Sequence, residues 1–373
     1  MKIKLSNLDV LRALLAVYVI AGHCRWLLWA GHAQWIQEKH SYWANILAYC
    51  SAGFRYGHEA VIVFFVLSGF FIHIRAAQRF SAGEEPAIDI KKYFIRRGHR
   101  LVPPYLLALL ITIIADMIGK SLWPELYSGQ TGDVLLDVNF GEKKGYSISA
   151  VVSAMLLLPS ASGKDFGTNG PLWSLAFETL YYLAYPLWLR FRSHYGRNAF
   201  VAVGIVSPLA YCFSGGRFLA VVLGHYYLWI AGAALAEVVV DSRSVKVFIK
   251  YLLVFIVCVA GLAACTGMQN VILILYLLLG IGCVMLIGSS SFLQRGRWGY
   301  CLLEALGVRS YSLYIYHFPL LVLISSWSFH VLGRRPMSGW LAMLGGGGVI
   351  LISLFCFEIC EKRFLHNRLR IES

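Results

Sequence analysis

Charged side chains are scarce in this sequence, since only 14% of its 373 residues are Asp, Glu, Lys or Arg. A soluble globular chain usually carries about a quarter, so this charge is too little to cover a soluble domain of the same length. Hydrophobic residues make up 58% of the chain, and they form runs long enough to cross a hydrocarbon layer about 30 Å thick. The composition therefore excludes an ordinary soluble protein and predicts an integral membrane protein.

Several chemical motifs are also missing. The nine cysteines include no C-x-x-C pair and most lie in apolar runs, so a disulfide framework is not indicated, although a pair between Cys24 and Cys50 is left open. No HExxH sequence and no Cys/His cluster occurs, so we expect no metal site. The absence of a Walker A or GxGxxG loop argues against nucleotide hydrolysis and dinucleotide redox chemistry. No small-residue cleavage site follows the first apolar run, so we expect no cleavable signal peptide.

Ten apolar segments can be drawn as membrane-spanning helices, and the basic residues gather in alternate loops between them. Although the formal charge is +14, this distribution indicates cytoplasmic loops rather than a nucleic-acid partner. It predicts that both termini and residues 78–100 are cytoplasmic, with residues 120–170 outside. We therefore predict an all-α polytopic transmembrane bundle of about ten spans, with residues 1–373 as a single domain. The predicted spans are 8–30, 59–77, 101–119, 171–190, 199–214, 218–240, 247–265, 269–289, 306–328 and 339–360.

Two of the loops are predicted to be more than connectors. Residues 90–97 form a basic amphipathic stretch, which we expect to lie along the inner interface of the membrane. Residues 148–159 are apolar but too short to span, which suits an interfacial or re-entrant helix.

Ionisable residues within the first span are functional candidates, because charge inside a membrane is costly. Asp9 precedes Arg12 by three residues and can pair with it. Arg12 and His23 are 11 residues apart, about three helical turns, so they share a face and His23 lies about 16 Å further out. A neutralised ion pair and an interhelical hydrogen bond would explain these residues without a function. Their shared face favours a functional role.

A second candidate, Glu178, lies in the fourth predicted span. Counting residues places Glu178 about 10 Å, and His23 about 8 Å, below the outer boundary of the membrane. A histidine and a carboxylate at one depth can form a general-base pair in which the carboxylate orients the imidazole. The alternative is a structural contact of Glu178 with an arginine or a tyrosine.

Other spans carry further polar side chains. No G-x-S-x-G elbow surrounds Ser68, so it is a poor nucleophile, and the Ser68-Gly69 pair more often lets another helix or a ligand approach. The ninth span holds Tyr314 and His317. His317 would lie near the middle of the membrane and either line the same cavity or brace it, and bracing is favoured.

These stretches together resemble the acyltransferase-3 family of integral membrane acyltransferases, which includes bacterial O-acetyltransferases of surface polysaccharides. Each stretch alone is a weak signal, but they follow the family's order over nearly the whole chain. One departure is Val61 to Val63, where many members have a small and an acidic residue. The matching stretches are NLDVLR (7–12), GH (22–23), FFVLSGFF (64–71), RRGHRLVPPY (96–105), WSLAFE (173–178) and YSLYIYHFP (311–319).

The resemblance implies a ten-helix acyltransferase domain that uses acyl-CoA, usually acetyl-CoA, as co-substrate. By this resemblance, Arg12 and His23 correspond to residues that are essential in the family. Arg97 and Arg100 correspond to the family's R-x-x-R element, and Trp173 and Glu178 to its tryptophan-to-glutamate motif. The chain also ends soon after the tenth span, so we expect no appended hydrolase-like domain. The site expected on these grounds has Arg12, His23 and Glu178 as catalytic residues, and Ser68, Trp173, Tyr314 and His317 as substrate-binding residues.

The expected mechanism follows from the chemistry of the donor. The polyanionic CoA head group should stop at the inner face, where Arg96, Arg97 and Arg100 offer guanidinium forks for phosphates. His23 would remove the proton of an acceptor hydroxyl while Glu178 orients the imidazole. A transient acyl-histidine is a variant of this scheme.

Three functions are compatible with these features. The favoured one is an O-acetyltransferase of the bacterial cytoplasmic (inner) membrane that acylates an extracytoplasmic saccharide such as O-antigen, lipopolysaccharide or exopolysaccharide. The second is an acyltransferase for a small or lipidic acceptor. The third is a glycan transporter or flippase, although the internal repeats common in transporters are not evident. The partners expected are acyl-CoA, a saccharide or glycolipid and the lipid bilayer, with no nucleic acid.

Overall fold

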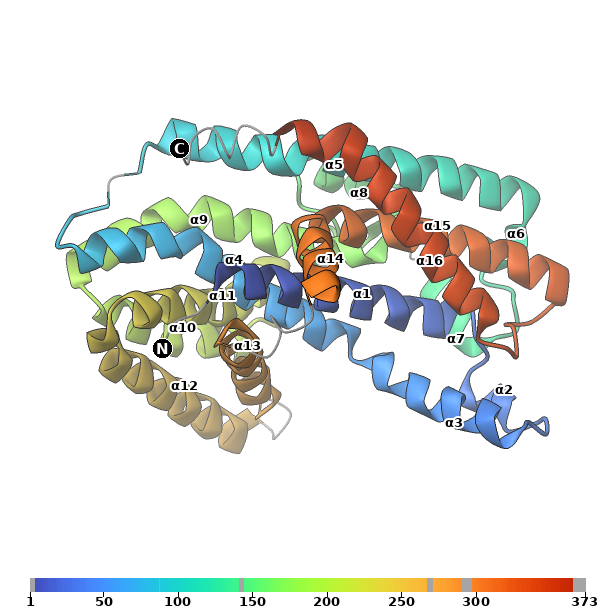
Figure 1. The fold of residues 1–373 in the computed structure, drawn as a ribbon, viewed down its shortest axis with the longest axis horizontal. Coiled ribbons are helices and arrows are strands. Elements are labelled where there is room, and N and C mark those ends of the chain that lie inside the picture. Colours follow the sequence, from blue (N-terminus) through green and yellow to red (C-terminus); the bar gives the residue numbers. More distant parts are fainter. Residues whose placement is uncertain (1–3, 87, 141–143, 267–270, 290–296, 365–373) are drawn as a thin grey trace. The chain divides into compact units, whose positions relative to one another are not determined.

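The computed structural model describes residues 4–86, 88–140, 144–266, 271–289 and 297–364, and most of these residues are helical (Figure 1). Helices satisfy every backbone N–H and C=O within one segment, which is what an apolar surrounding requires. A two-residue parallel pair joins β1 (Lys144–Gly145) to β2 (Asp165–Phe166). The helices are α1 (Leu5–Leu27), α2 (His32–Trp35), α3 (Tyr42–Ser51), α4 (Gly57–Ser81), α5 (Ile90–Leu122), α6 (Pro124–Ser128), α7 (Val134–Phe140), α8 (Ile148–Met155), α9 (Trp173–Tyr195), α10 (Asn198–Cys212), α11 (Phe218–Val240), α12 (Val245–Thr266), α13 (Ile272–Ser289), α14 (Arg297–Val308), α15 (Ser310–Leu332) and α16 (Trp340–Cys356).

The predicted all-α membrane fold is confirmed. Among the described residues, eight helices are long and apolar enough to cross a membrane: α1, α4, α5, α11, α12, α13, α15 and α16. The two other predicted spans, 171–190 and 199–214, fall on α9 and α10. Helix α9 carries Glu178, Arg190 and Arg192, and α10 has only 15 residues. The apolar segment predicted at 148–159 forms the short helix α8.

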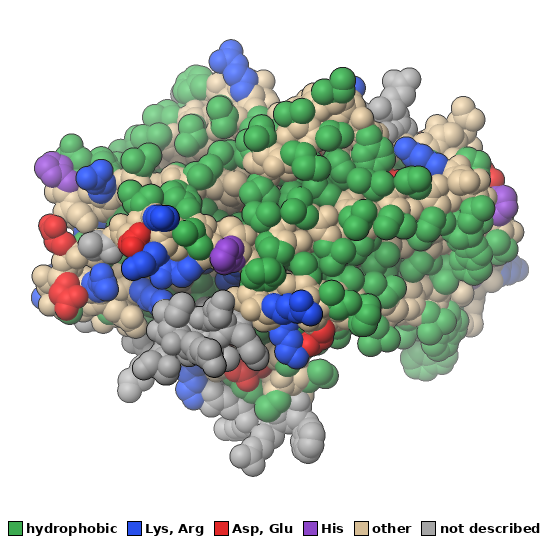
Figure 2. Space-filling model, turned by 90° about the horizontal axis from the view of Figure 1, so that it is seen from above, with side chains coloured by type: hydrophobic (Ala, Val, Ile, Leu, Met, Phe, Trp, Pro, Cys, Tyr) green, Lys and Arg blue, Asp and Glu red, His purple; other side chains and the backbone are tan. Residues whose placement is uncertain are grey.

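A stripe of exposed apolar side chains on α5 shows how such a helix meets lipid. Leu106, Leu110, Ile114 and Met117 recur at helical spacing, and each is between 48% and 66% exposed. Figure 2 shows a broad hydrophobic area on one face of the molecule, with few charged side chains interrupting it. Soluble monomers rarely expose apolar patches this extensive, so a hydrocarbon surrounding accounts for them.

The chain divides into two compact units, each built from separate segments of the sequence. Unit 1 comprises Met1–Leu15, Glu59–Tyr93 and Phe177–Gly307. Unit 2 comprises Ala16–His58, Phe94–Ala176 and Val308–Ser373. Helices α1, α4, α5 and α9 contribute residues to both units, and the single domain expected over residues 1–373 stays a prediction.

Within unit 1, helices α4 and α11 meet backbone to backbone. A Cβ atom built on Gly69 would lie 1.8 Å from the carbonyl oxygen of Trp229, and one on Gly232 would lie 1.9 Å from that of Val66. Only glycine fits at either position, because real atoms never approach so closely. The close helix approach predicted at Ser68-Gly69 is therefore present. In the same unit, α10, α11 and α12 lie side by side (Figure 1).

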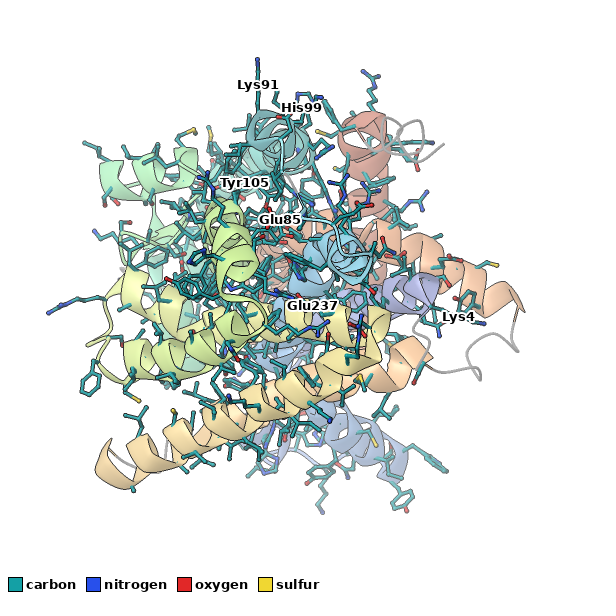
Figure 3. All side chains as sticks on the ribbon, turned by 90° about the vertical axis from the view of Figure 1, so that its left-hand side faces the viewer. Lys4, Glu85, Lys91, His99, Tyr105 and Glu237 are labelled. Carbon is teal, nitrogen blue, oxygen red and sulfur yellow. The ribbon has the colours of Figure 1, made fainter. Side chains whose placement is uncertain are left out.

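A buried polar network joins three helices of unit 1. Glu237 on α11 is 3% exposed and lies among the helices (Figure 3). Its two carboxylate oxygens each accept a hydrogen bond of 2.8 Å from Arg192 on α9. His73 on α4 donates from Nε2 to Glu237 (3.1 Å) and accepts at Nδ1 from the hydroxyl of Tyr185 (3.2 Å). Each buried charge thus has a partner, as burial requires.

Removing one member of this network should destabilise the protein strongly. Glu237→Gln leaves the guanidinium of Arg192 buried without its counter-charge, which typically costs about 3–5 kcal/mol. We expect a clear fall in the thermal unfolding midpoint in detergent micelles. The matched control is Arg243→Ala, which removes an exposed partner of Asp241 and should leave the midpoint unchanged. An unchanged midpoint in Glu237→Gln would contradict this account of the network.

Candidate active site

In unit 2, the structure brings His23 and His317 together. Nδ1 of His23 on α1 lies 2.7 Å from Nε2 of His317 on α15. Their ring centroids are 5.0 Å apart and their planes differ by 17°. His317 is fully buried, whereas His23 retains some exposure. His317, predicted to line the site or to brace it, is therefore the direct neighbour of the predicted base.

A chain of hydrogen bonds continues from His317 to the start of α9. Nδ1 of His317 lies 2.6 Å from the carbonyl oxygen of Tyr314. The Tyr314 hydroxyl lies 2.8 Å from the Ser174 hydroxyl and donates to the carbonyl of Pro171 at 2.8 Å. Tyr314, predicted as a substrate-binding residue, therefore connects α15 to α9 within this unit.

Aromatic residues surround part of the His23 ring. The Phe318 ring lies 4.9 Å from the His23 ring, edge to face. Trp26 lies 6.4 Å from the same ring and stacks on Phe140 of α7 at 5.9 Å. Phe318 and Phe140 are 5% and 1% exposed. A surrounding of low polarity strengthens the hydrogen bond between the two imidazoles.

Trp173, another predicted substrate-binding residue, pairs with a histidine that sequence reasoning missed. Its ring stacks on His58, with centroids 5.5 Å apart and planes 21° apart. Nothing in the sequence marked His58, which is separated from Trp173 by more than a hundred residues. Trp26 could have been found, because it follows His23 at helical spacing, but Phe140 carried no comparable signal.

The arginines predicted to bind the donor lie near the beginning of α5. Arg96 is exposed, and Arg97 and Arg100 are half-buried. Four residues beyond Arg100, about 6 Å along the helix, the carbonyl of Pro104 accepts a hydrogen bond from Tyr316 (3.1 Å). Tyr316 is the chain neighbour of His317, so within unit 2 the arginines lie a short helical stretch away from the histidine pair.

Glu178 and Ser68 meet in unit 1. The Ser68 hydroxyl donates to Oε1 of Glu178 at 3.0 Å, and the Tyr182 hydroxyl donates to the same oxygen. Trp229 donates from Nε1 to the Ser68 hydroxyl at 3.3 Å. The glutamate–tyrosine contact weighed from sequence is therefore present. The pairing of Glu178 with His23, which belongs to unit 2, stays a prediction.

The predicted ion pair near the start of α1 is confirmed. Arg12 lies 3.3 Å from Asp9, and the two side chains are 15% and 25% exposed. The guanidinium also stands over the Phe71 ring, 5.6 Å from its centroid. The catalytic role expected for Arg12 stays a prediction.

The cysteine pair left open from sequence is not formed. Cys24 is buried and Cys50 is exposed, and both are free thiols.

Comparison with known proteins defines the class. A family model described as an acyltransferase domain matches residues 5–358, so the chain belongs to the acyltransferase-3 family. It is similar to the peptidoglycan O-acetyltransferase OatA of Listeria monocytogenes, with 23% identity over 97% of this chain and 56% of that protein. It is also similar to the O-acetyltransferase OatA of Staphylococcus aureus (strain NCTC 8325), with 25% identity over 98% of this chain and 57% of that protein.

The chain thus spans a little over half the length of these curated relatives. No solved structure matches it significantly.

Proposed function

We propose that this protein is an O-acetyltransferase that moves an acetyl group from acetyl-CoA to a hydroxyl of a cell-envelope saccharide. Membership of the acyltransferase family gives the reaction class, and the relatives named as O-acetyltransferases suggest acetyl and a saccharide. The observation that carries the proposal is His23, a partly exposed imidazole whose Nδ1 lies 2.7 Å from Nε2 of His317. A held imidazole is the commonest general base in proteins.

In the proposed reaction, His23 takes the proton of the acceptor hydroxyl as its oxygen attacks the thioester carbonyl. The new C–O bond forms, the C–S bond breaks, and the proton passes from His23 to the departing thiolate, which leaves as free CoA thiol. Glu178 is proposed to orient the His23 imidazole, and Arg12 is proposed as a further catalytic residue. Trp173 with its neighbour His58, and Tyr314, are proposed to meet the acceptor, since aromatic ring faces pack well against sugars. Ser68 is proposed as a further acceptor-binding residue.

The donor is proposed to bind at Arg96, Arg97 and Arg100 of α5. Guanidinium groups match the phosphates of CoA, and about 10 Å of helix separates Arg97 from Pro104, beside Tyr316. A pantetheine arm is long enough to cover that distance. The positive-inside pattern of the loops supports a cytoplasmic donor side, an extracytoplasmic acceptor and a location in the bacterial cytoplasmic membrane.

Charge removal at α5 tests the donor site. The double variant Arg97→Ala, Arg100→Ala should weaken acetyl-CoA affinity at least ~10-fold, because each charge-assisted hydrogen bond contributes about 1.5–3 kcal/mol. Acceptor affinity should change little. The matched control is Lys91→Ala, Lys92→Ala, which removes two charges from exposed side chains of the same helix; Lys91 extends away from the helices (Figure 3). Equal donor affinity in the arginine variant and the wild type would refute the assignment.

The function itself is tested with purified protein, acetyl-CoA and a panel of acceptors that includes peptidoglycan fragments and exopolysaccharide. Acceptor-dependent release of CoA thiol, with an added acetyl mass on the saccharide, is the expected result. Thiol release only with a small or lipidic acceptor would correct the acceptor class. No thiol release with any acceptor would favour a transporter and overturn the proposal.

A further inference from the structure

We propose that His317 is a positioning residue that sets the tautomer of His23 and leaves Nε2 of His23 as the atom that accepts the proton. This inference rests on the proposed function, in which His23 is the general base. The reacting nitrogen is Nε2 of His23, and His317 is the group that leaves it without a proton. The contacts that support the inference all lie within unit 2.

A contact with a backbone carbonyl fixes the tautomer of His317. Its Nδ1 lies 2.6 Å from the carbonyl oxygen of Tyr314. A carbonyl oxygen can only accept a hydrogen bond, so Nδ1 of His317 must carry a proton. A neutral imidazole has one protonated and one bare nitrogen. Nε2 of His317 is then bare, and it faces His23 as an acceptor.

The tautomer of His317 in turn fixes the tautomer of His23. Its Nδ1 lies 2.7 Å from Nε2 of His317, and two bare nitrogens at this distance would repel each other. A single proton must lie between them, and it belongs to Nδ1 of His23 because Nε2 of His317 is the acceptor. Neutral His23 therefore has a bare Nε2, which is the nitrogen that can take a proton from a hydroxyl.

The residue that supplies this carbonyl, Tyr314, is anchored through its side chain. The Tyr314 hydroxyl donates to the carbonyl of Pro171 and contacts the Ser174 hydroxyl, both at 2.8 Å. His317 is fully buried, so water does not compete for its nitrogens. The Phe318 ring, 4.9 Å from His23, limits rotation of the imidazole. The geometry thus fixes both the proton position and the ring orientation before substrate arrives.

The proton balance is simple. His23 accepts the hydroxyl proton at Nε2 and becomes an imidazolium, while Nδ1 keeps its proton and its hydrogen bond to His317. The same proton then leaves from Nε2 to the CoA thiolate. His317 gains and loses no proton, so it acts through His23 alone.

Two substitutions of similar polarity separate positioning from packing. In His317→Gln, the side-chain oxygen can reach the position of Nε2 and accept from His23. In His317→Asn, the shorter amide can reach only the position of Nδ1. We expect kcat within ~10-fold of wild type for His317→Gln, and a loss of ~100- to 10,000-fold for His317→Asn and His317→Ala. The KM for acetyl-CoA should change little in all three. His32→Gln, at an exposed histidine of α2, is the control and should behave as wild type.

A spectroscopic readout tests the tautomer directly. In protein labelled with ¹⁵N-histidine and reconstituted in liposomes, neutral wild-type His23 should show a protonated Nδ1 and a bare Nε2. His317→Ala should mix or reverse that pattern. A protonated Nε2 in neutral wild-type His23 would overturn the inference, even if the variants failed to fold.

The outcomes also separate this inference from the proposed function. If His23→Ala retains transfer, the proposed function fails. If His23→Ala is inactive but His317→Asn is as active as His317→Gln, only the inference about His317 fails.

Discussion

His23→Ala is expected to reduce acetyl transfer by ~100- to 10,000-fold while the folded protein still binds acetyl-CoA. Loss of a positioned general base typically has this effect on kcat. The measurement is kcat for thiol release with a saturating saccharide acceptor. Donor affinity, measured separately by calorimetry, serves as the control for folding.

A purely structural role for His23 predicts a different pattern. Its hydrogen bond to His317 would then be a helix-to-helix contact, and His23→Ala would lower the unfolding midpoint and the donor affinity together. Well-folded His23→Ala with near-normal transfer would show that His23 is not the base.

Glu178→Gln is expected to reduce kcat strongly but less completely than His23→Ala. A carboxylate that orients a catalytic histidine can contribute up to ~10,000-fold. The double variant should be little slower than His23→Ala alone, because residues acting as a unit are not additive. The test is a double-mutant cycle, in which kcat is measured for the wild type, the two single variants and the double variant.

The matched control for this cycle is Tyr182→Phe. The Tyr182 hydroxyl donates to Glu178, and loss of one such bond should cost less than ~10-fold, since a neutral hydrogen bond contributes about 0.5–1.5 kcal/mol. If the effects of Glu178→Gln and His23→Ala simply multiply, Glu178 acts separately from His23. The hydrogen bonds that Glu178 accepts from Ser68 and Tyr182 would then indicate a structural role for this carboxylate.

Local signals in the sequence predicted the helices and some contacts within them. Apolar runs of spanning length predicted the eight candidate membrane helices. Such a run can be recognised in the sequence because its length and its backbone hydrogen bonds belong to one continuous segment. The Asp9–Arg12 pair was predictable for the same reason, since three residues separate its members. The positions of helices α9 and α10 were also predicted. Neither is among the eight candidate spans, because α9 carries several charges and α10 is short.

Contacts between distant segments were not predictable in this way. His23 and His317 are almost three hundred residues apart, and no periodicity links positions on separate helices. The charges of Glu237 and Arg192 were visible in the sequence, but not that His73 completes their network. Family motifs did point to His23, Glu178, Trp173 and Tyr314. They left open which of these side chains touch, and gave no sign of His58 or Phe140.

The most direct test of the central claim uses proteoliposomes that contain the purified protein, with deuterium-labelled acetyl-CoA on the side of the α5 arginines and a saccharide acceptor on the other side. Mass spectrometry of the acceptor measures the transferred group. The account predicts labelled acetyl esters on the saccharide and an equal amount of free CoA thiol with the wild type, and neither with His23→Ala. Labelled esters formed equally by both proteins, or thiol release without acetylated saccharide, would contradict it.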